Sequence, residues 1–294
     1  MSEDVHACPL CGSNQSSLFD RRAFRGLEVV NCLCRACELV YMSPRMSEAE
    51  AAEFYQAEYR QLYQGDENPI AKDFATQTAR ADSLLSFVKL HAPAVTRHLD
   101  IGCSTGLILQ GFQKYYCCQA VGIEPGDAYR TYARKQGLTV YATLDELKTW
   151  PELPFDLITM SHVLEHLPDP AAYLAHLREK VLASDGWLVL EVPNLYCHDS
   201  FEVAHLVSYS AHTLSQIVIK AGFGIVAVEK HGRPRSDLLP LYITLLARPA
   251  EQTWSLHPER FVALKRRVGL LRRRILERLF PQKAWKNYSE SPER

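Results

Sequence analysis

The fold is decided by residues 97–109, with the sequence RHLDIGCSTGLIL, in which an apolar run leads into a short loop with two glycines. The GCSTG segment within it fits two kinds of site. It fits the G-x-S-x-G elbow of α/β-hydrolases, which would make Ser104 a nucleophile. It also fits a glycine-rich turn between a strand and a helix that holds a nucleotide-like cofactor.

The position of this loop in the chain argues against a hydrolase. A hydrolase elbow comes after several earlier strands, whereas the strand ending at Ile101 is the first one predicted for its domain. No His-Gly-Gly segment of the type that builds an oxyanion hole lies upstream. We therefore expect Ser104 to belong to a cofactor loop.

An acidic residue follows where a cofactor loop needs one. Gly102 and Gly106 supply the loop, and the next apolar run ends at Glu124, where an acid accepts hydrogen bonds from ribose hydroxyls. Asp100 stands directly before the loop, where its charge would repel a pyrophosphate and suit a cationic ligand. This combination indicates S-adenosylmethionine as the cofactor.

Downstream of residue 95, short apolar strands alternate with helices, which predicts a parallel sheet with helices on both faces. The last two strands have no helix between them, so they are expected to form an antiparallel hairpin at the sheet edge. The expected strands are 95–101, 119–124, 155–160, 186–192, 223–230 and 238–247, and the expected helices are 107–116, 127–136, 169–182 and 210–222.

The composition fits an ordinary globular protein of 294 residues, with 47% hydrophobic and 23% charged residues. We find no signal segment and no apolar run long enough to span a bilayer, which predicts a cytoplasmic protein. The charge is uneven, because 22 Lys and Arg stand against 30 Asp and Glu before His257, and 11 against 4 from His257 onward.

The first forty residues carry paired cysteines at the spacing of a zinc ribbon. Cys8 and Cys11 form one pair, and Cys34 and Cys37 form a second pair after 22 intervening residues. Cys32 competes with Cys34 as a ligand. A zinc ion with four cysteine ligands has no open position, so its expected role is to support the fold.

Two helices are expected between the ribbon and the main domain. Ser47 and Glu50 form a capping box for a helix within residues 43–63, the segment 66–69 breaks the chain, and a second helix spans 71–90. The predicted segments are a zinc ribbon at 1–45, a helical linker or lid at 46–92, a catalytic domain at 93–250 and a basic tail at 251–294.

The segments LDIGCSTG, GIEP, FDLITMSHVLEHLPDP and AHLVSYSAHTLSQIVIKAGF resemble class I S-adenosylmethionine-dependent methyltransferases, over residues 95–248. The subgroup is the one that contains ubiquinone-biosynthesis and related small-molecule enzymes. The resemblance implies a seven-stranded Rossmann-like methyltransferase fold. It also implies the residues that bind the cofactor, which are Asp100, Gly102, Cys103, Ser104, Gly106, Glu124, Pro125 and Ser161.

The N-terminal half resembles bacterial methyltransferases related to deoxysugar C-methyltransferases, which also begin with a cysteine-rich segment. Those enzymes carry a further large C-terminal domain that has no counterpart here, which argues against C-methylation. The expected activity is methyl transfer to oxygen of a small molecule, a sugar or a glycan.

Three histidines are the candidate catalytic residues. His162 and His166, four residues apart after the fourth strand of the family pattern, would share one face if a helix begins there. His205 lies in the long connection 193–210, where it could act as a base toward a hydroxyl. The alternatives are that Glu165 and His166 stabilise a turn, that His205 anchors its loop, or that His162 and His166 bind a metal.

Two other functions compete with this one. A zinc module also begins some ribosomal-RNA methyltransferases, but here Ser-His-Val-Leu stands in place of the Asn-Pro-Pro-Tyr segment that grips a base. The acidic body also lacks the basic face that phosphates require, so nucleic acid is not an expected partner. The remaining alternative is a catalytically silent binding module.

The tail predicts a basic amphipathic helix with apolar residues at three- and four-residue spacing, namely Leu264, Val268, Leu271, Ile275 and Leu279. Such a helix can lie on an anionic membrane surface, which would place the protein at the inner face of the membrane. It can instead pack on the acidic body, form a homodimer or remain solvated.

Overall fold

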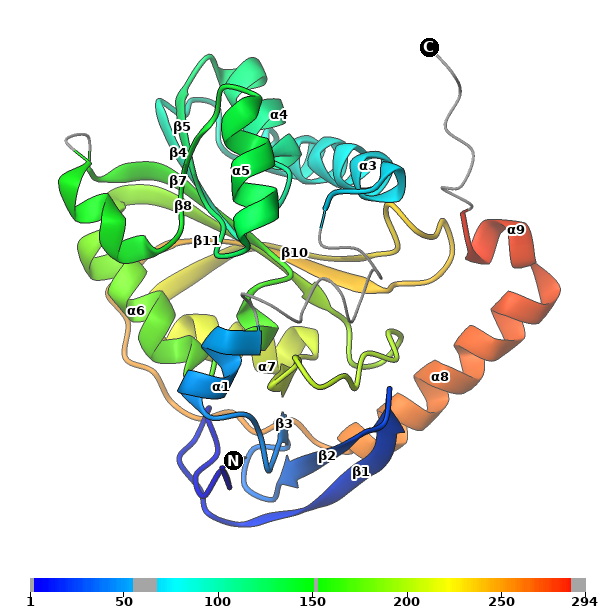
Figure 1. Ribbon diagram of the computed structural model, residues 1–294. Helices are drawn as coiled ribbons and strands as arrows, with labels where there is room; N and C mark the ends of the chain where they lie inside the picture. The colour runs from blue at the N-terminus through cyan, green and yellow to red at the C-terminus, as the bar shows by residue number, and fades with distance from the viewer. Residues whose placement is uncertain (1–2, 55–67, 151–152, 287–294) are drawn as a thin grey trace.

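The computed structural model describes residues 3–54, 68–150 and 153–286 and contains two β-sheets (Figure 1). The strands of the larger sheet are β4 (Arg97–Ile101), β5 (Gln119–Ile123), β6 (Thr139–Tyr141), β7 (Phe155–Ser161), β8 (Leu182–Pro193), β10 (Phe223–His231) and β11 (Tyr242–Pro249). These seven strands lie in the order β10-β11-β8-β7-β4-β5-β6.

The pairing confirms the predicted α/β sheet. The neighbours from β8 through β7, β4 and β5 to β6 are parallel, whereas β11 is antiparallel to both β8 and β10. The edge hairpin is therefore also confirmed. The chain winds outward from β4 to β6 and then returns to β7 on the other side of β4. Ligands bind at such a reversal, beyond the carboxyl ends of the strands.

Helices cover both faces of this sheet (Figure 1). Apolar residues of α3 and α4, such as Leu84 and Phe112, fill the core on one face, whereas Leu174 of α6 and Ile217 of α7 belong to the core on the other. The helical elements are α3 (Ala71–Val88), α4 (Leu107–Tyr116), α5 (Asp127–Lys135), α6 (Pro170–Lys180) and α7 (Ala211–Lys220), with 3-10 turns η2 (Leu144–Thr149) and η3 (Leu164–His166).

The smaller sheet joins the cysteine-rich segment to the rest of the molecule. Its strands are β1 (Ser16–Phe24), β2 (Leu27–Cys34), β3 (Val40–Met42) and β9 (Val207–Ser208), in that order. Because β9 belongs to the connection between β8 and α7, its pairing with β3 makes a backbone bridge between the two parts. The division of the chain into four segments stays a prediction.

The capping box after the ribbon is present at α1 (Glu48–Glu53). The Ser47 hydroxyl accepts from the Glu50 N–H at 3.4 Å, and the Glu50 carboxylate accepts from the Ser47 N–H at 2.9 Å. These bonds satisfy donors that a helix start leaves unpaired. The remainder of that predicted helix, 55–63, and the first part of the predicted break at 66–69 lie outside the described residues.

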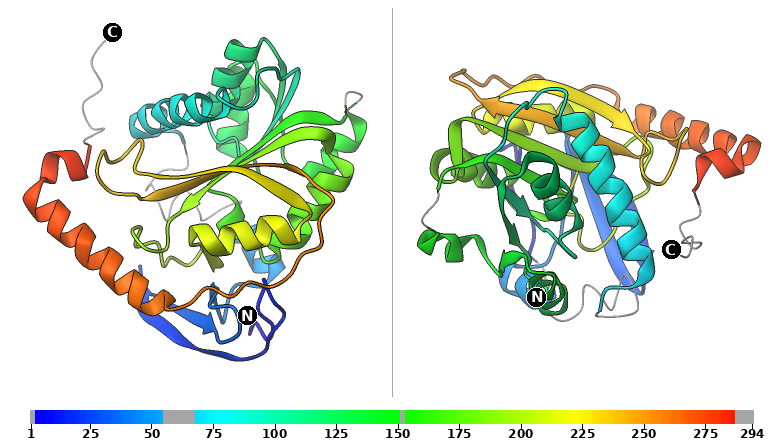
Figure 2. Two further views of the ribbon diagram at one scale, coloured as in Figure 1. Left: turned by 180° about the vertical axis from the view of Figure 1, so that it is seen from behind. Right: turned by 90° about the horizontal axis from the view of Figure 1, so that it is seen from above.

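The tail forms the predicted helix, α8 (Val262–Leu279), followed by the short helix α9 (Pro281–Ala284). Figure 2 shows α8 running along the outside of the molecule. Its first N–H, that of Val262, donates to the Glu38 carboxylate at 2.7 Å, and the N–H of Lys286 donates to the Arg235 carbonyl at 2.9 Å. Within the described residues, no helix combines the length and apolar character that crossing a bilayer requires.

Candidate active site

The glycine loop between β4 and α4 depends on left-handed backbone conformations. Gly102 has φ 75° and Gly106 has φ 83°, and a Cβ at these positions would lie 2.4 Å from Val163 and 2.2 Å from Leu138. Any other residue at these positions would adopt an unfavourable positive φ, and its Cβ would collide with a neighbouring side chain. Ser104 also has φ 53°, and its buried hydroxyl has no hydrogen-bond partner among the described residues.

Glu124 is bound to the loop that it was predicted to accompany. One carboxylate oxygen accepts from the Ser104 N–H at 2.9 Å, and the other accepts from the Gly126 N–H at 2.9 Å. The side chain is buried, at 4% exposure. These two bonds join the acid to the glycine loop as one unit.

Asp100 lies beneath the loop, at 1% exposure. One carboxylate oxygen accepts from the Thr159 hydroxyl at 2.6 Å, and the other has no hydrogen-bond partner among the described residues. Burial raises the pKa of this carboxyl to about 7. A nearby cation would favour its ionised form. The Cys103 side chain is also buried, against Gly122, so only its backbone could face a ligand in the loop.

Two adjoining cavities lie at the carboxyl end of the sheet. The smaller, of about 270 Å³, is lined by Glu124 and Pro125, and the larger, of about 440 Å³, is lined by residues of α3 and the connection after β8. Three residues line both of them: Gly102, His162 and His166. A ligand in one cavity and a second ligand in the other would therefore meet at these residues.

His162 lies between two buried carboxylates. Its Nδ1 is 3.2 Å from Glu165 and its Nε2 is 3.5 Å from Glu191. The expectation that His162 and His166 share a helix face is wrong, because His162 has φ 55° and the only helical turn nearby is the three-residue η3. Ser161 precedes it, and its hydroxyl donates to Glu191 at 3.2 Å.

His166 instead lies beside His205, with ring centroids 4.9 Å apart. Each Nδ1 lies 2.8 Å from a backbone carbonyl, that of Ala204 for His166 and that of Ser200 for His205. A carbonyl only accepts, so each Nδ1 carries the proton and each Nε2 keeps its lone pair. Burial lowers the pKa of His166 to about 4 and also lowers the pKa of His205.

The carboxylate of Glu165 completes a cluster with these two histidines. One ligand atom from each of the three residues lies within 4.8 Å of the others, so the cluster could hold a cation or a shared proton. Burial by itself raises the pKa of the Glu165 carboxyl, but the adjacent His162 and the other imidazoles hold it at about 2. A negative charge thus lies beneath the two imidazoles.

Sequence reasoning missed the polar network in the floor of the larger cavity. Arg80 of α3 forms an ion pair with Glu191 of β8 at 2.9 Å, and both side chains are buried. His231 lies 3.5 Å from the other Glu191 oxygen. The Tyr242 ring lies beside the His231 ring and the Arg80 guanidinium. Glu191 could have indicated this network from the sequence, because a carboxylate within an apolar strand requires a buried partner.

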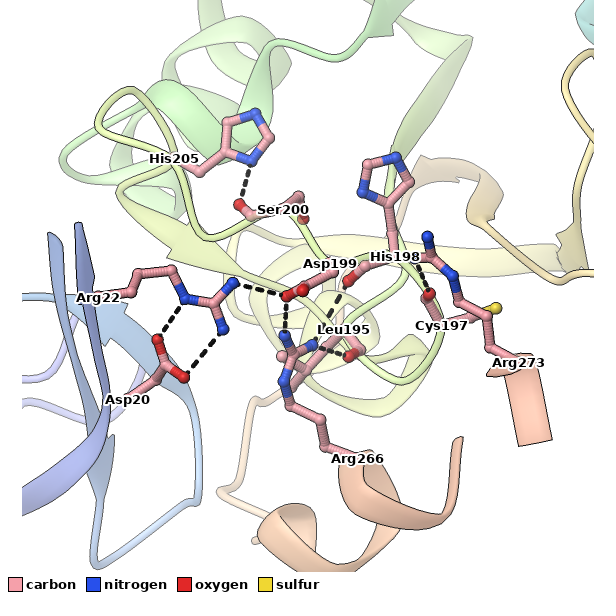
Figure 3. Close-up of polar contacts among 10 residues, drawn as sticks. All are labelled: Asp20, Arg22, Leu195, Cys197, His198, Asp199, Ser200, His205, Arg266 and Arg273. Carbon is pink, nitrogen blue, oxygen red and sulfur yellow. Dashed lines mark hydrogen bonds and ion pairs between the residues drawn. The ribbon is translucent and has the colours of Figure 1, made fainter. Parts of the chain in front are cut away.

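The connection after β8 carries His198 and His205 into the larger cavity and is held from two sides (Figure 3). The Asp199 carboxylate accepts from Arg22 of β1 at 2.9 Å and from Arg266 of α8 at 2.8 Å. The N-terminal hairpin and the C-terminal helix therefore both fix the position of this part of the site.

The four predicted zinc ligands come together at the N-terminus. Cys8 and Cys37 have their sulfurs 3.5 Å apart, as do Cys11 and Cys34, and all four sulfurs lie within 4.8 Å of one another. Four sulfurs around a tetrahedral zinc are about 3.8 Å apart, given Zn–S bonds of about 2.3 Å. The cluster therefore fits the ion, and Cys32 is not part of it.

The family model described as a methyltransferase domain matches residues 74–228. Among curated proteins, the chain is 28% identical over 127 residues to a ubiquinone biosynthesis O-methyltransferase of Hahella chejuensis, covering 41% of this chain and 47% of that protein. It is 31% identical over 154 residues to an uncharacterized methyltransferase of Schizosaccharomyces pombe, covering 46% and 53%. The chain spans about half the length of the curated relatives it matches.

Solved structures share the fold at low sequence identity. A 1,6-didemethyltoxoflavin-N1-methyltransferase of Burkholderia thailandensis has a TM-score of 0.56 at 17% identity, covering 79% of this chain and all of that one. A SAM-dependent methyltransferase of Archaeoglobus fulgidus has a TM-score of 0.50 at 17% identity, covering 64% and 97%. With more than half of its residues matched by the family model, this chain belongs to the methyltransferase domain family.

Proposed function

We propose that this chain transfers a methyl group from S-adenosylmethionine to a hydroxyl oxygen of a polar small molecule, sugar or glycan fragment. The observation that carries the proposal is the pair of adjoining cavities that share Gly102, His162 and His166. A donor in the smaller cavity and an acceptor in the larger one would be held with their reacting atoms close together, which supplies much of the rate in a displacement reaction.

The smaller cavity has the chemistry of a nucleoside site. Glu124 would accept hydrogen bonds from the ribose hydroxyls, and Pro125 would contact the adenine. The backbone around Gly102, Cys103, Ser104 and Gly106 would follow the methionine and ribose portions. Asp100, beneath the loop with one oxygen unpaired, would favour the positive charge of the methionine portion, directly or through water.

The larger cavity is lined by charged and polar side chains, among them Arg80, Glu202 and Arg235, and these suit an acceptor rich in hydroxyl groups. When bound, S-adenosylmethionine supplies an electrophilic methyl group on a sulfonium. Transfer of that group to the acceptor oxygen would break the carbon–sulfur bond and leave its electron pair on sulfur. The acceptor proton passes to the Nε2 lone pair of His166, which lines both cavities.

The neighbouring histidines would have separate roles. His205 would orient the acceptor hydroxyl from the larger cavity, and His162, held between Glu165 and Glu191, would lie nearest the transferred methyl group. The names of several curated relatives, which are ubiquinone biosynthesis O-methyltransferases, support oxygen as the methylated atom.

We also propose that Cys8, Cys11, Cys34 and Cys37 bind a structural zinc ion. The sulfur distances support this, and the pairing of β3 with β9 would transmit its stabilising effect to the catalytic domain. Cysteines that bind a metal and form no disulfides are typical of a reducing compartment, which supports a cytoplasmic location.

The test has two stages. Isothermal titration with S-adenosylmethionine and S-adenosylhomocysteine should give saturable binding, and its absence would overturn the enzymatic proposal in favour of a silent binding module. Phenols, nucleotide sugars, glycan fragments and ribosomal RNA are then screened for release of S-adenosylhomocysteine. Turnover with hydroxyl acceptors supports the proposal, whereas turnover with RNA alone would replace it with nucleic-acid methylation.

A further inference from the structure

The outward face of α8 is an apolar stripe that nothing in the described chain covers. Figure 2 shows the helix on the outside of the molecule. Six large apolar side chains on or beside it are between 48% and 69% exposed: Phe261, Leu264, Val268, Leu271, Ile275 and Leu279. Their spacing of three and four residues places them along one side of the helix. We call these six residues the apolar stripe.

The inward face of the same helix is mixed, because Val262 and Leu276 pack against apolar clusters and arginines lie between them. In an ordinary amphipathic helix of a globular protein the apolar residues face the core, whereas here most of the large ones face outward. Arg266 is buried and donates to the Asp199 carboxylate at 2.8 Å, and Arg273 donates to the Cys197 carbonyl at 2.9 Å. At Gly269 an added Cβ would lie 1.9 Å from the Tyr196 carbonyl oxygen, so the helix backbone approaches the body closely there. These contacts fix which face points outward.

Cationic side chains border the apolar stripe on both sides. They are Lys265 and Arg272 on one side, and Arg267, Arg274 and Arg278 on the other. All five are exposed, and Lys265 also pairs with the Glu259 carboxylate at 3.0 Å. The only acidic residue of α8, Glu277, turns toward the body, where it accepts from Arg273 at 2.7 Å and from the Trp285 indole at 2.9 Å. The outward surface is therefore apolar at its centre and positive at both borders.

This distribution of charge disfavours a second copy of the chain as the occupant. In a coiled-coil register through Leu264, Val268, Leu271 and Ile275, the flanking e and g positions are Lys265, Arg267, Arg272 and Arg274. Self-pairing in either direction would place cations opposite cations. An anionic surface that accepts apolar side chains has the complementary chemistry.

We propose that α8 docks on an anionic phospholipid membrane, with the helix in the plane of the interface and the apolar stripe inserted among the acyl chains. The helix is tied to the body at its start, through Val262 and Glu38, and beyond its end, through Lys286 and Asp237 at 2.6 Å. It therefore presents the stripe already folded, and docking brings the whole enzyme to the membrane surface.

The experiment is co-sedimentation of the full chain with vesicles of phosphatidylcholine alone or of phosphatidylcholine with phosphatidylglycerol. The wild-type protein should sediment with the anionic vesicles only, and added salt should weaken the binding because the charges lie at the surface. Leu264→Gln/Leu271→Gln should lower the partition constant at least about tenfold, since two leucines lose their burial in lipid. Both side chains are more than half exposed, so the fold is preserved.

Matched controls separate the stripe from general surface changes. Leu18→Gln/Leu90→Gln replaces leucines of 61% and 73% exposure elsewhere and should bind as wild type. Arg267→Glu/Arg274→Glu should weaken binding by more than about twentyfold, because each basic residue near an anionic surface contributes about fivefold. Lys89→Glu/Lys180→Glu, with the same change in charge at exposed positions at the ends of α3 and α6, should have a much smaller effect.

Three results would overturn the proposal. They are wild-type protein that remains in the supernatant with anionic vesicles, stripe variants that bind as wild type, and a dimer in sedimentation velocity that Leu264→Gln/Leu271→Gln dissociates. The last result would assign the stripe to a second copy. None of these measurements uses methyl transfer, so they are independent of the proposed function.

Discussion

The guanidinium of Arg266 lies 2.8 Å from the Asp199 carboxylate, and this ion pair fastens α8 to the loop that carries His198 and His205 (Figure 3). The Arg266 side chain is 7% exposed and also donates to the Leu195 carbonyl. Helix and loop thus share one buried cation. A change in the position of α8 would therefore move the loop that lines the larger cavity.

Replacing Arg266 with methionine should lower the free energy of unfolding by about 1–3 kcal/mol, because the buried Leu195 carbonyl loses its donor. The pair with the half-exposed Asp199 contributes less, since water screens it. Urea unfolding measures the loss. Arg267→Met, at an exposed neighbouring position, should stay within about 0.5 kcal/mol of wild type. Equal stability of the two variants would contradict a structural role for Arg266.

Glu124→Gln should weaken binding of S-adenosylmethionine about 10- to 100-fold, because an amide nitrogen would face one of the two N–H groups that the carboxylate now accepts. Titration calorimetry gives the dissociation constant. Asp127→Asn is the control, since its side chain is 84% exposed, and its affinity should match wild type. Unchanged affinity in Glu124→Gln would remove Glu124 from the proposed ribose site.

His166→Gln should lower kcat about 100-fold or more with little change in affinity for the cofactor, because it removes the proposed proton acceptor and keeps a similar shape. The exposed His176 of α6 provides the control variant His176→Gln. The readout is release of S-adenosylhomocysteine with the acceptor identified by the screen. A wild-type kcat in His166→Gln would show that His166 is not the base, and His205→Gln would be tested next.

The stability of the protein should fall as pH drops from about 6.5 to about 4. Burial lowers the pKa of His98 to about 3 and that of His166 to about 4, so the unfolded chain takes up these two protons first. Asp100 opposes them, because its pKa of about 7 lets the native state take up one proton first. Burial also lowers the pKa of His198, His205 and His231, so the unfolded chain takes up more than one extra proton in this range. The slope should therefore exceed about 1.4 kcal/mol per pH unit.

Urea unfolding at pH 6.5, 5.5 and 4.5 tests this slope. His166→Gln removes one of these histidines, so its slope should be smaller than that of the wild type by up to about 1.4 kcal/mol per pH unit, while His176→Gln should keep the full slope. Stability that is constant for the wild type between these values would contradict neutral buried histidines.

The sequence sufficed for features that depend on local pattern. The glycine loop, the strand–helix alternation and the edge hairpin follow from periodicity and turn residues, and the sheet confirms them. The spacing of the cysteines left Cys32 and Cys34 both open, because spacing does not specify where a side chain points. The fold resolves this, since Cys34 lies in the cluster and Cys32 does not.

Features that depend on tertiary contact were not predictable. The ion pair of Arg80 with Glu191 joins a helix expected to be a linker to a central strand, and no local pattern connects them. The left-handed conformation of His162 displaced it from the helix face expected for it. The apolar stripe of α8 was evident as a periodicity, but only the contacts of Arg266 and Arg273 decide that it faces outward.

Zinc removal should increase the mobility of the backbone around β9, although β9 supplies none of the proposed zinc ligands. β3 follows the Cys37 knuckle and pairs with β9, where the Val40 and Tyr41 backbone lies opposite Ser208 and Val207. Cys34→Ser, or chelation of the wild type, should therefore increase hydrogen exchange at the amides around β9 as well as in the ribbon. The matched control is Cys32→Ser, which should retain one zinc per chain by elemental analysis and wild-type exchange. Faster exchange confined to the ribbon would show that β9 is held by the catalytic domain alone, and a Cys34→Ser protein that keeps its zinc would remove Cys34 from the proposed ligands.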